Sequence, residues 1–207
     1  MEAILEVSKV AKHFGGFTAL HEVNLQVGRG ERLGLIGPNG SGKTTLISCI
    51  SGALQNDGGS IKFEGREMTG MKAFERTRLG IARSFQIPRP FHSMTVLENL
   101  LVPLAYVGGV SGNKAQQQAM DILHEMGLAE KAHAGSGALS QVELRKMELA
   151  RAMAARPQLL ISDEAMAGLS GSEVDDVLDI LIKLNNQGIT IITVSYTHLT
   201  LPTNREV

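Results

Sequence analysis

The chain has 207 residues, of which 43% are hydrophobic and 20% charged, a composition typical of one globular domain. Its 20 basic residues are offset by 21 acidic ones, and the resulting net charge of −1 argues against a protein that binds nucleic acid through bulk charge. Cys49 is the single cysteine, and neither a signal peptide nor an apolar run of the ~18 to 20 residues needed for a membrane helix is present. We therefore expect a cytoplasmic protein without a nucleic-acid partner.

Strand signals dominate the N-terminal part of the chain. Apolar and polar residues alternate over residues 4–7 and 23–27, which predicts half-exposed strands of an antiparallel sheet. Residues 32–36 are nearly all apolar, as in a strand buried on both faces. A glycine-rich turn and an expected helix over residues 43–50 follow. Residues 61–64 alternate again and are bounded by glycines, which predicts a further strand.

The middle of the chain predicts helices instead. Thr95 and Glu98 form a capping box, and apolar residues recur at helical spacing over residues 115–126 and 142–153. Alternation of strand and helix then resumes with a strand over residues 159–161, a helix over 172–185 and a strand over 189–194. The layout predicts an α/β protein, in which a helical subdomain at about residues 90–155 interrupts a parallel-sheet core.

A glycine-rich segment after the buried strand matches the pattern G-x-x-x-x-G-K-[ST] of phosphate-binding loops. Such a loop surrounds phosphates with backbone N–H groups at a helix N-terminus, while its lysine adds a mobile charge and its hydroxyl residue can bind Mg2+. A turn that merely joins two elements is the alternative, but the strand before and the helix after favour nucleoside triphosphate binding. The expected binding residues are Gly37, Pro38, Asn39, Gly40, Ser41, Gly42, Lys43, Thr44 and Thr45.

Two adjacent acids, Asp163 and Glu164, end the buried strand that begins at residue 159. In a protein with a phosphate loop, the first acid at this place can reach Mg2+ through water, and the second can polarise the attacking water. A helix-capping pair of acids is the alternative interpretation. The phosphate loop upstream favours a site for hydrolysis.

With these motifs the chain resembles the nucleotide-binding subunits of ABC transporters, and among them the ATP-binding subunits of branched-chain amino acid importers. The resemblance covers residues 1 to about 194 and rests on the phosphate loop, the run over residues 80–91, and residues 148–152 ahead of the acid pair. It implies the ABC type of P-loop NTPase fold, with an N-terminal antiparallel β-subdomain and an inserted all-helical subdomain. It also implies an ATPase that uses ATP and Mg2+ and lies on the inner face of the cell membrane.

The resemblance also implies roles for individual residues. Lys43 would hold the β- and γ-phosphates, Thr44, Gln86 and Asp163 would hold Mg2+, and Glu164 would be the general base, with Gln86 also at the attacking water. Phe14 would stack on adenine, although a lone phenylalanine is more often a core residue. Transmembrane permease subunits would contact residues 88–94, from Pro88 to Met94.

A second ATPase subunit, identical or paralogous, is implied as a head-to-tail partner. The motif that would contact the partner's ATP differs from its usual sequence, Leu-Ser-Gly-Gly-Gln. Here Leu139 is followed by Ser140, Gln141, Val142 and Glu143. Val142 places a branched Cβ where close backbone approach is expected.

The last residues depart from the family altogether. Ser195 and Tyr196 stand where a glutamate and a γ-phosphate-sensing histidine are usual, and residues 194–203 resemble a translated sequencing-library adapter. We therefore expect residues 195–207 to be a non-native tail on a truncated domain, with ATP binding but weak or no hydrolysis. The alternative is a divergent C-terminus in which His198 replaces the usual histidine.

Two other functions fit parts of the sequence. A soluble, non-transport ABC ATPase would act on ribosomes or DNA, but the chain has no tandem domain and no basic excess. A non-hydrolysing nucleotide sensor is suggested by Val142 and by Ser170, which stands where Asp or Asn is common. The prolines that bracket the segment after Gln86 favour a membrane partner.

Overall fold

The computed structural model describes residues 2–85, 87–163, 169–195 and 205–206 of the chain. The elements of the N-terminal half are β1 (Ala3–Phe14), β2 (Phe17–Gly28), β3 (Arg32–Ile36), α1 (Lys43–Ser51), β4 (Gly58–Phe63), β5 (Arg66–Glu67), α2 (Ala73–Arg78) and β6 (Ile81–Ser84). Those that follow are α3 (Val96–Tyr106), α4 (Gly112–Glu125), the 3-10 turns η1 (Ala129–Lys131) and η2 (Ser136–Ala138), α5 (Gln141–Ala154), β7 (Leu159–Asp163), α6 (Gly171–Asn186), β8 (Thr190–Ser195) and β9 (Arg205–Glu206).

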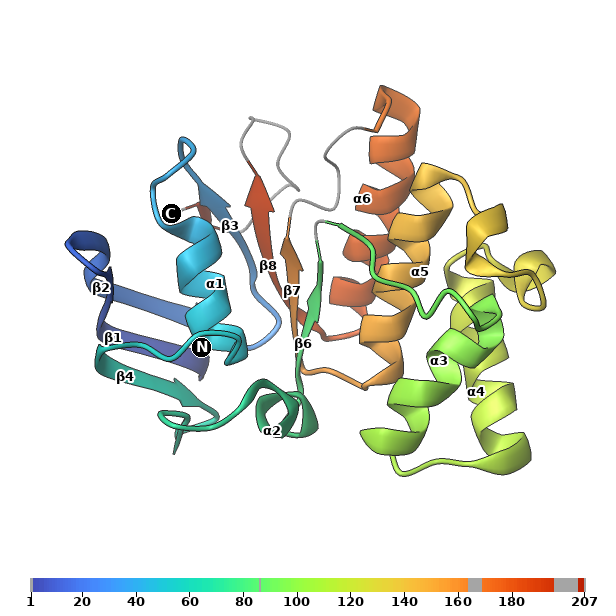
Figure 1. Ribbon diagram of the computed structural model, residues 1–207, viewed down its shortest axis with the longest axis horizontal. Coiled ribbons are helices and arrows are strands. Elements are labelled where there is room, and N and C mark those ends of the chain that lie inside the picture. Colours follow the sequence, from blue (N-terminus) through green and yellow to red (C-terminus); the bar gives the residue numbers. More distant parts are fainter. Residues whose placement is uncertain (1, 86, 164–168, 196–204, 207) are drawn as a thin grey trace.

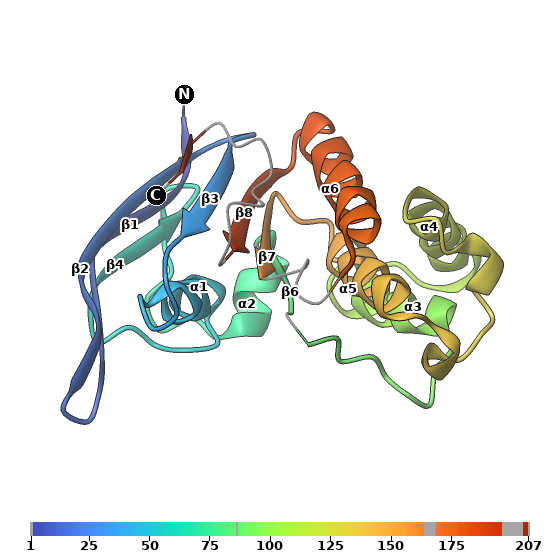
Figure 2. The same ribbon diagram turned by 90° about the horizontal axis from the view of Figure 1, so that it is seen from above.

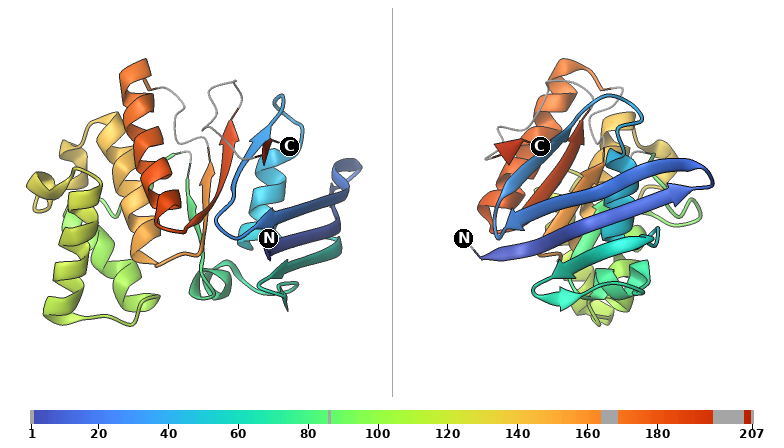
Figure 3. Two further views of the ribbon diagram at one scale, coloured as in Figure 1. Left: turned by 180° about the vertical axis from the view of Figure 1, so that it is seen from behind. Right: turned by 90° about the vertical axis from the view of Figure 1, so that its left-hand side faces the viewer.

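The strands form two sheets. The antiparallel sheet has the order β2-β1-β4-β5, and the other sheet has the order β6-β7-β8-β3-β9 with parallel neighbours. Figure 1 shows the antiparallel sheet on the left, the parallel strands in the centre and α3 to α6 on the right. In Figures 1 and 2, α1 lies between the two sheets. The described C-terminal strand β9 lies beside β3, as the two further views in Figure 3 also show.

Two hydrophobic clusters hold these layers together. The first joins both sheets to α1, with Leu33 and Ile47 fully buried within it. The second joins α3, α4, α5 and α6 to the parallel sheet, around Leu123, Met147 and Leu160. Because the phosphate-loop helix belongs to the first cluster, packing between the sheets fixes its position.

The predicted fold class is confirmed, and the elements differ from the prediction in detail. The expected strands at residues 4–7 and 23–27 are parts of the longer β1 and β2, which pair with irregular register near Val10. The sequence reasoning missed β6, whose Arg83 and Ser84 interrupt an apolar run, and α2, a six-residue helix in which only Arg76 is buried. Within the described residues, no helix is long and apolar enough to cross a bilayer.

Candidate functional site

The phosphate loop joins β3 to α1, as the sequence predicts. Gly42 precedes the helix with a φ of 92°, and a Cβ at this position would lie 2.7 Å from the carbonyl oxygen of Ala19. Only glycine fits here, because a side chain would both strain the backbone and collide with β2. The start of the helix thus lies directly against the antiparallel sheet.

Lys43 folds back over its own loop. Its Nζ donates hydrogen bonds to the carbonyl oxygens of Gly37 at 2.6 Å and Pro38 at 2.9 Å, and to Ser41 Oγ at 3.3 Å. The residue is 9% exposed, and with these contacts the ammonium lies inside the curl of the loop. Phosphate oxygens entering this curl would offer a charged acceptor to an ammonium that is already in place.

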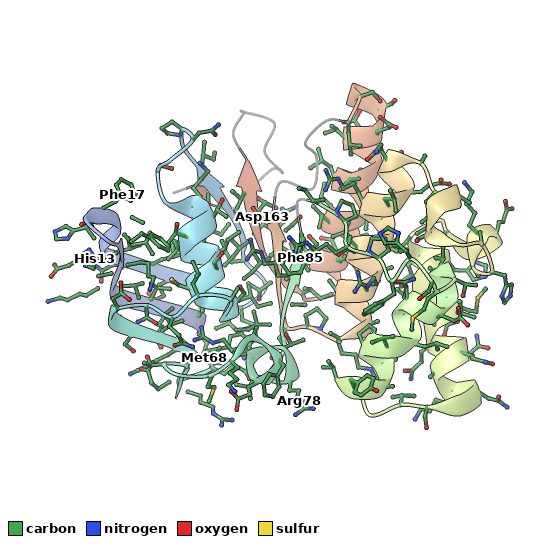
Figure 4. All side chains as sticks on the ribbon, viewed as in Figure 1. His13, Phe17, Met68, Arg78, Phe85 and Asp163 are labelled. Carbon is green, nitrogen blue, oxygen red and sulfur yellow. The ribbon has the colours of Figure 1, made fainter. Side chains whose placement is uncertain are left out.

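Two aromatic side chains share a cavity with this loop. The cavity, of about 180 Å3, is lined by Phe14, Phe17 and Ala19 on one side and by residues 40–45 on the other. Phe14 and Phe17 are paired across the hairpin between β1 and β2 and are 47% and 63% exposed. Figure 4 labels Phe17 at the tip of this hairpin. The structure thus brings Phe14 to the phosphate loop, as expected, and adds Phe17, which the Phe-Gly-Gly-Phe spacing could have indicated.

Asp57 holds this hairpin to the segment that follows α1. Its Oδ1 accepts from Lys12 Nζ at 2.7 Å, and its Oδ2 accepts from the backbone N–H of His13 at 2.7 Å. The hydrogen bond from Lys12, together with that from His13, lowers the pKa of Asp57 below its usual value. The Lys12 ammonium in turn lies 5.6 Å from the centre of the Phe14 ring. No local sequence pattern pointed to Asp57, because its partners lie on another strand.

The acid pair is described in part. Asp163 is the last residue of β7 and is 3% exposed, while Glu164 and Gln86 lie outside the described residues. Asp163 Oδ2 accepts from Arg83 Nη2 at 2.5 Å, and Oδ1 is buried with no hydrogen-bond partner among the described residues. Figure 4 shows Asp163 and Phe85 at the same end of the parallel sheet.

This unpartnered oxygen is the observation that bears on Mg2+. A buried acceptor without a donor is costly unless a ligand completes it, and Mg2+ favours carboxylate and hydroxyl oxygens, often through water. Asp163 Oδ1 and the Thr44 hydroxyl supply that donor chemistry. Among the described residues, no group of three or more His, Cys, Asp or Glu side chains forms a metal cluster. The residues therefore fit an ion that takes its other ligands from phosphate and water.

The start of α5 carries the residues expected to meet a partner's nucleotide. Ser140 is the N-cap, its Oγ accepts from Glu143 N at 3.3 Å, and Glu143 Oε2 accepts from Ser140 N at 2.8 Å. Hydrogen bonds from Lys131 and from the Ser140 backbone hold the pKa of Glu143 below its usual value, so the cap stays ionised at neutral pH. Val142 is half-buried against the helical cluster, so Ser140 and Gln141 form the exposed start of this helix.

A groove lies between the parallel sheet and the helical subdomain. It has a volume of about 390 Å3, and exposed aromatic rings, Phe85, Phe91 and Tyr106, are among the residues that line it. Arg89 and Arg151 add positive charge to this lining. The segment from Pro88 to Met94 borders the groove, through Arg89 and Phe91.

Two buried polar side chains fix the loop beside the groove. Glu148 Oε1 accepts from Arg89 N at 3.1 Å and from Arg151 Nη1 at 2.6 Å. Asn99 Oδ1 accepts from Phe91 N at 2.8 Å, and Asn99 Nδ2 donates to Phe91 O at 3.2 Å. Both residues are at most 4% exposed. The loop that leads into the helical subdomain is therefore held in one arrangement by α3 and α5.

Comparisons with known proteins agree with this geometry. A family described as ABC transporter matches residues 20–167. The high-affinity branched-chain amino acid transport ATP-binding protein BraF of Pseudomonas aeruginosa is 36% identical, over 93% of this chain and 82% of its own. The ADP conformation of MJ1267, an ATP-binding cassette of an ABC transporter, superposes with a TM-score of 0.86 at 33% identity, over 95% of this chain and 82% of its own. A dimeric structure of the cassette MJ0796 bound to ADP and Pi superposes with a TM-score of 0.83 at 26% identity, over 93% and 88% of the two chains.

Proposed function

The chain belongs to the ABC transporter family of ATP-binding subunits, and from that premise we propose that it powers import of branched-chain amino acids or similar solutes through a membrane permease. Binding of ATP and a transport ATPase function follow from the family. The observation that carries the assignment is a phosphate loop with Lys43 inside its curl, next to a pair of exposed aromatic rings. A subunit that drives this permease with ATP would act on the inner face of the cell membrane.

Each part of the site has a role in this proposal. The base stacks at Phe14 and Phe17, the loop N–H groups surround the phosphates, and Lys43 neutralises charge on the β- and γ-phosphates. Thr44 and Asp163, with Gln86, would hold Mg2+, which when bound would draw charge from the phosphates. Glu164 takes a proton from the attacking water.

The base pocket gives a direct prediction. Phe14→Ala and Phe17→Ala should each weaken ATP binding about three- to tenfold, because an aromatic stack contributes roughly 1 kcal/mol. Binding of tripolyphosphate, which has no base, should stay unchanged in both variants. Phe74→Ala, which removes an exposed ring on α2, is the matched control. Equal losses for ATP and tripolyphosphate would show that the rings only support the loop.

The proposed dimer uses the exposed start of α5. Ser140 and the following backbone N–H groups would meet the γ-phosphate of ATP held by a second subunit, identical or paralogous. Gln141 lies beside Ser140, and the Glu143 cap keeps the helix start ordered. MJ0796, similar to this chain, is dimeric in its ADP and Pi state.

The groove is the proposed contact for the permease. Its aromatic rings and arginines would receive an intracellular segment of the permease, with the loop of Pro88 to Met94 at its border. Glu148→Gln should remove the negative charge that holds the Arg151 guanidinium and weaken the acceptor of the Arg89 backbone N–H. We expect recovery of the chain with detergent-extracted permease to fall several-fold, while ATP affinity stays within twofold. Loss of ATP affinity instead would show that Glu148 acts on the nucleotide site.

We also propose that the chain as printed binds ATP but hydrolyses it slowly. Ser195 ends β8 at the position that pairs with Ile36, next to the phosphate loop, and Tyr196 lies outside the described residues. The double variant Ser195→Glu, Tyr196→His should raise turnover at least tenfold without changing ATP affinity. Turnover equal to that of BraF in the unmodified chain would contradict the proposal.

The proposed origin of residues 195–207 has its own test. A foreign tail predicts that the source genomic DNA departs from the printed sequence after about residue 194. Genomic DNA that encodes the same thirteen residues in frame would contradict this origin. The tail proposal is independent of the function proposal, because the phosphate loop, Asp163 and the groove all precede it.

The class of transported solute can be tested in membrane vesicles. The chain with Ser195→Glu and Tyr196→His would be reconstituted in vesicles with the permease and binding protein encoded beside it. ATP would be added on the face of the vesicle membrane where the chain is bound. We expect ATP-dependent uptake of labelled leucine, isoleucine and valine, in excess of methionine. Uptake of methionine alone would contradict the proposed solute class and leave the ATPase assignment in place.

A further inference from the structure

Arg83 has no part in the site that the sequence predicted, yet its side chain lies next to that site. It projects from β6, and its side chain is 10% exposed. Nη2 donates to Asp163 Oδ2 at 2.5 Å, and Nη1 donates to Ser48 Oγ at 3.1 Å. Ser48 Oγ donates in turn to the carbonyl oxygen of Thr44 at 2.6 Å. One guanidinium therefore connects the acid at the end of β7 to the helix that begins in the phosphate loop.

This contact determines which oxygen of Asp163 is available. Since Arg83 occupies Oδ2, the remaining oxygen, Oδ1, is the one left buried and without a partner among the described residues. A guanidinium fork that contacts Ser48 as well as Asp163 holds the carboxylate in one rotation, which a freely turning cation would not do. The orientation of the acid is thus set by a neighbour on another strand.

The same guanidinium also contacts an aromatic ring of the groove. Its central carbon lies 5.2 Å from the centre of the Phe85 ring, which lines the groove. Phe85 directly precedes Gln86 in the chain. A cation over an aromatic face is attracted to it, so Phe85 is a further restraint on the guanidinium, besides Asp163 and Ser48.

We propose that Arg83 is a positioning residue of the metal site, which fixes Asp163 with Oδ1 toward Mg2+ and ties it to the phosphate-loop helix. This rests on the proposed Mg2+ and ATP site. Partners that orient a ligating carboxylate typically change metal affinity 10- to 100-fold when they are removed. Arg83 does not touch the phosphates in this scheme, so its effect appears only when Mg2+ is present.

The test compares ATP affinity with Mg2+ and with EDTA. Arg83→Met should leave the dissociation constant in EDTA within twofold and reduce the gain in affinity on adding Mg2+ at least tenfold. Arg83→Lys retains a positive charge but not the fork. Its thermal midpoint should therefore be close to that of the wild type, while its gain in ATP affinity on adding Mg2+ should be as small as in Arg83→Met. Arg78→Met, which removes an arginine lying 5.5 Å from the Phe74 ring, is the matched control and should change neither quantity.

Each other outcome has a defined meaning. An unchanged Mg2+ gain in Arg83→Met overturns the proposal, and so does an equal loss of affinity in EDTA and in Mg2+, which would indicate general structural support. If Arg83→Met does not fold, Ser48→Ala replaces it, with a several-fold loss of the Mg2+ gain expected and no loss contradicting the proposal. A wild-type chain that binds ATP without any Mg2+ gain would instead refute the proposed metal site.

Discussion

Replacing Lys43 by methionine is expected to weaken ATP binding about 100-fold. Methionine has a similar length and keeps the packing of the stem, but it loses the ammonium that lies inside the phosphate loop. Hydrogen bonds to charged groups contribute about 1.5 to 3 kcal/mol each, and the loss of two such bonds to phosphate amounts to about 3 kcal/mol, or roughly two orders of magnitude in affinity. Equilibrium dialysis with labelled ATP measures this directly.

The variant and its control separate binding from folding. The hydrogen bonds from Lys43 to Gly37, Pro38 and Ser41 all stay within the phosphate loop, so the thermal midpoint of Lys43→Met should shift by no more than a few degrees. Lys62→Met removes an exposed ammonium from β4 and should retain full ATP affinity. An affinity for ATP within threefold of wild type in Lys43→Met would contradict the assignment of the loop.

The second large effect concerns stability. Arg76 is fully buried, and its Nη1 donates to the carbonyl oxygens of Cys49 at 2.6 Å and Ile50 at 3.0 Å, at the end of α1. The same guanidinium donates to the carbonyl oxygens of Met68 and Met71. Arg76→Met removes one donor from each of these four acceptors. Cys49 O and Met68 O keep a backbone N–H, from Gly52 and Met71, whereas the carbonyl oxygens of Ile50 and Met71 lose the guanidinium. Since unsatisfied buried groups cost about 1 to 3 kcal/mol each, with partial relaxation, we expect a loss of about 3 to 5 kcal/mol.

Such a loss should lower the thermal midpoint by about 10 °C in a chain of this size. Arg78→Met on the same short helix serves as the control and should shift it by less than 2 °C, because surface substitutions rarely matter more. Saturating ATP should recover part of the loss, since a ligand that binds only the folded state stabilises it. A shift below 3 °C in Arg76→Met would show that water or other donors replace the guanidinium.

Local sequence patterns predicted the fold class and the phosphate loop because both depend on neighbours in the chain. The phosphate loop consists of a strand, a glycine turn and a helix start that follow one another directly in the chain. The capping box at Thr95 is equally local and is therefore visible in the sequence. The irregular pairing of β1 hid the true extent of that strand, and the polar residues of β6 hid the whole of that strand.

Contacts between distant residues escaped sequence reasoning. Arg83 and Asp163 are 80 positions apart, and Arg76 meets the end of α1 across 27 positions, so no spacing rule connects them. The sequence shows only that Val142 has a branched Cβ where close backbone approach is expected. In the structure its side chain packs against the helical cluster. Such placements depend on tertiary packing, which local sequence patterns do not reveal.

Docking of the chain on a membrane permease, as expected of a motor subunit, can be measured by co-purification. The chain would be expressed with the permease subunits encoded beside it, and detergent-extracted membranes and ribosomes would be isolated from the same cells. We expect the chain to be recovered with the permease, in amounts that Glu148→Gln reduces several-fold. Recovery with ribosomes, or none with the permease in either nucleotide state, would contradict it.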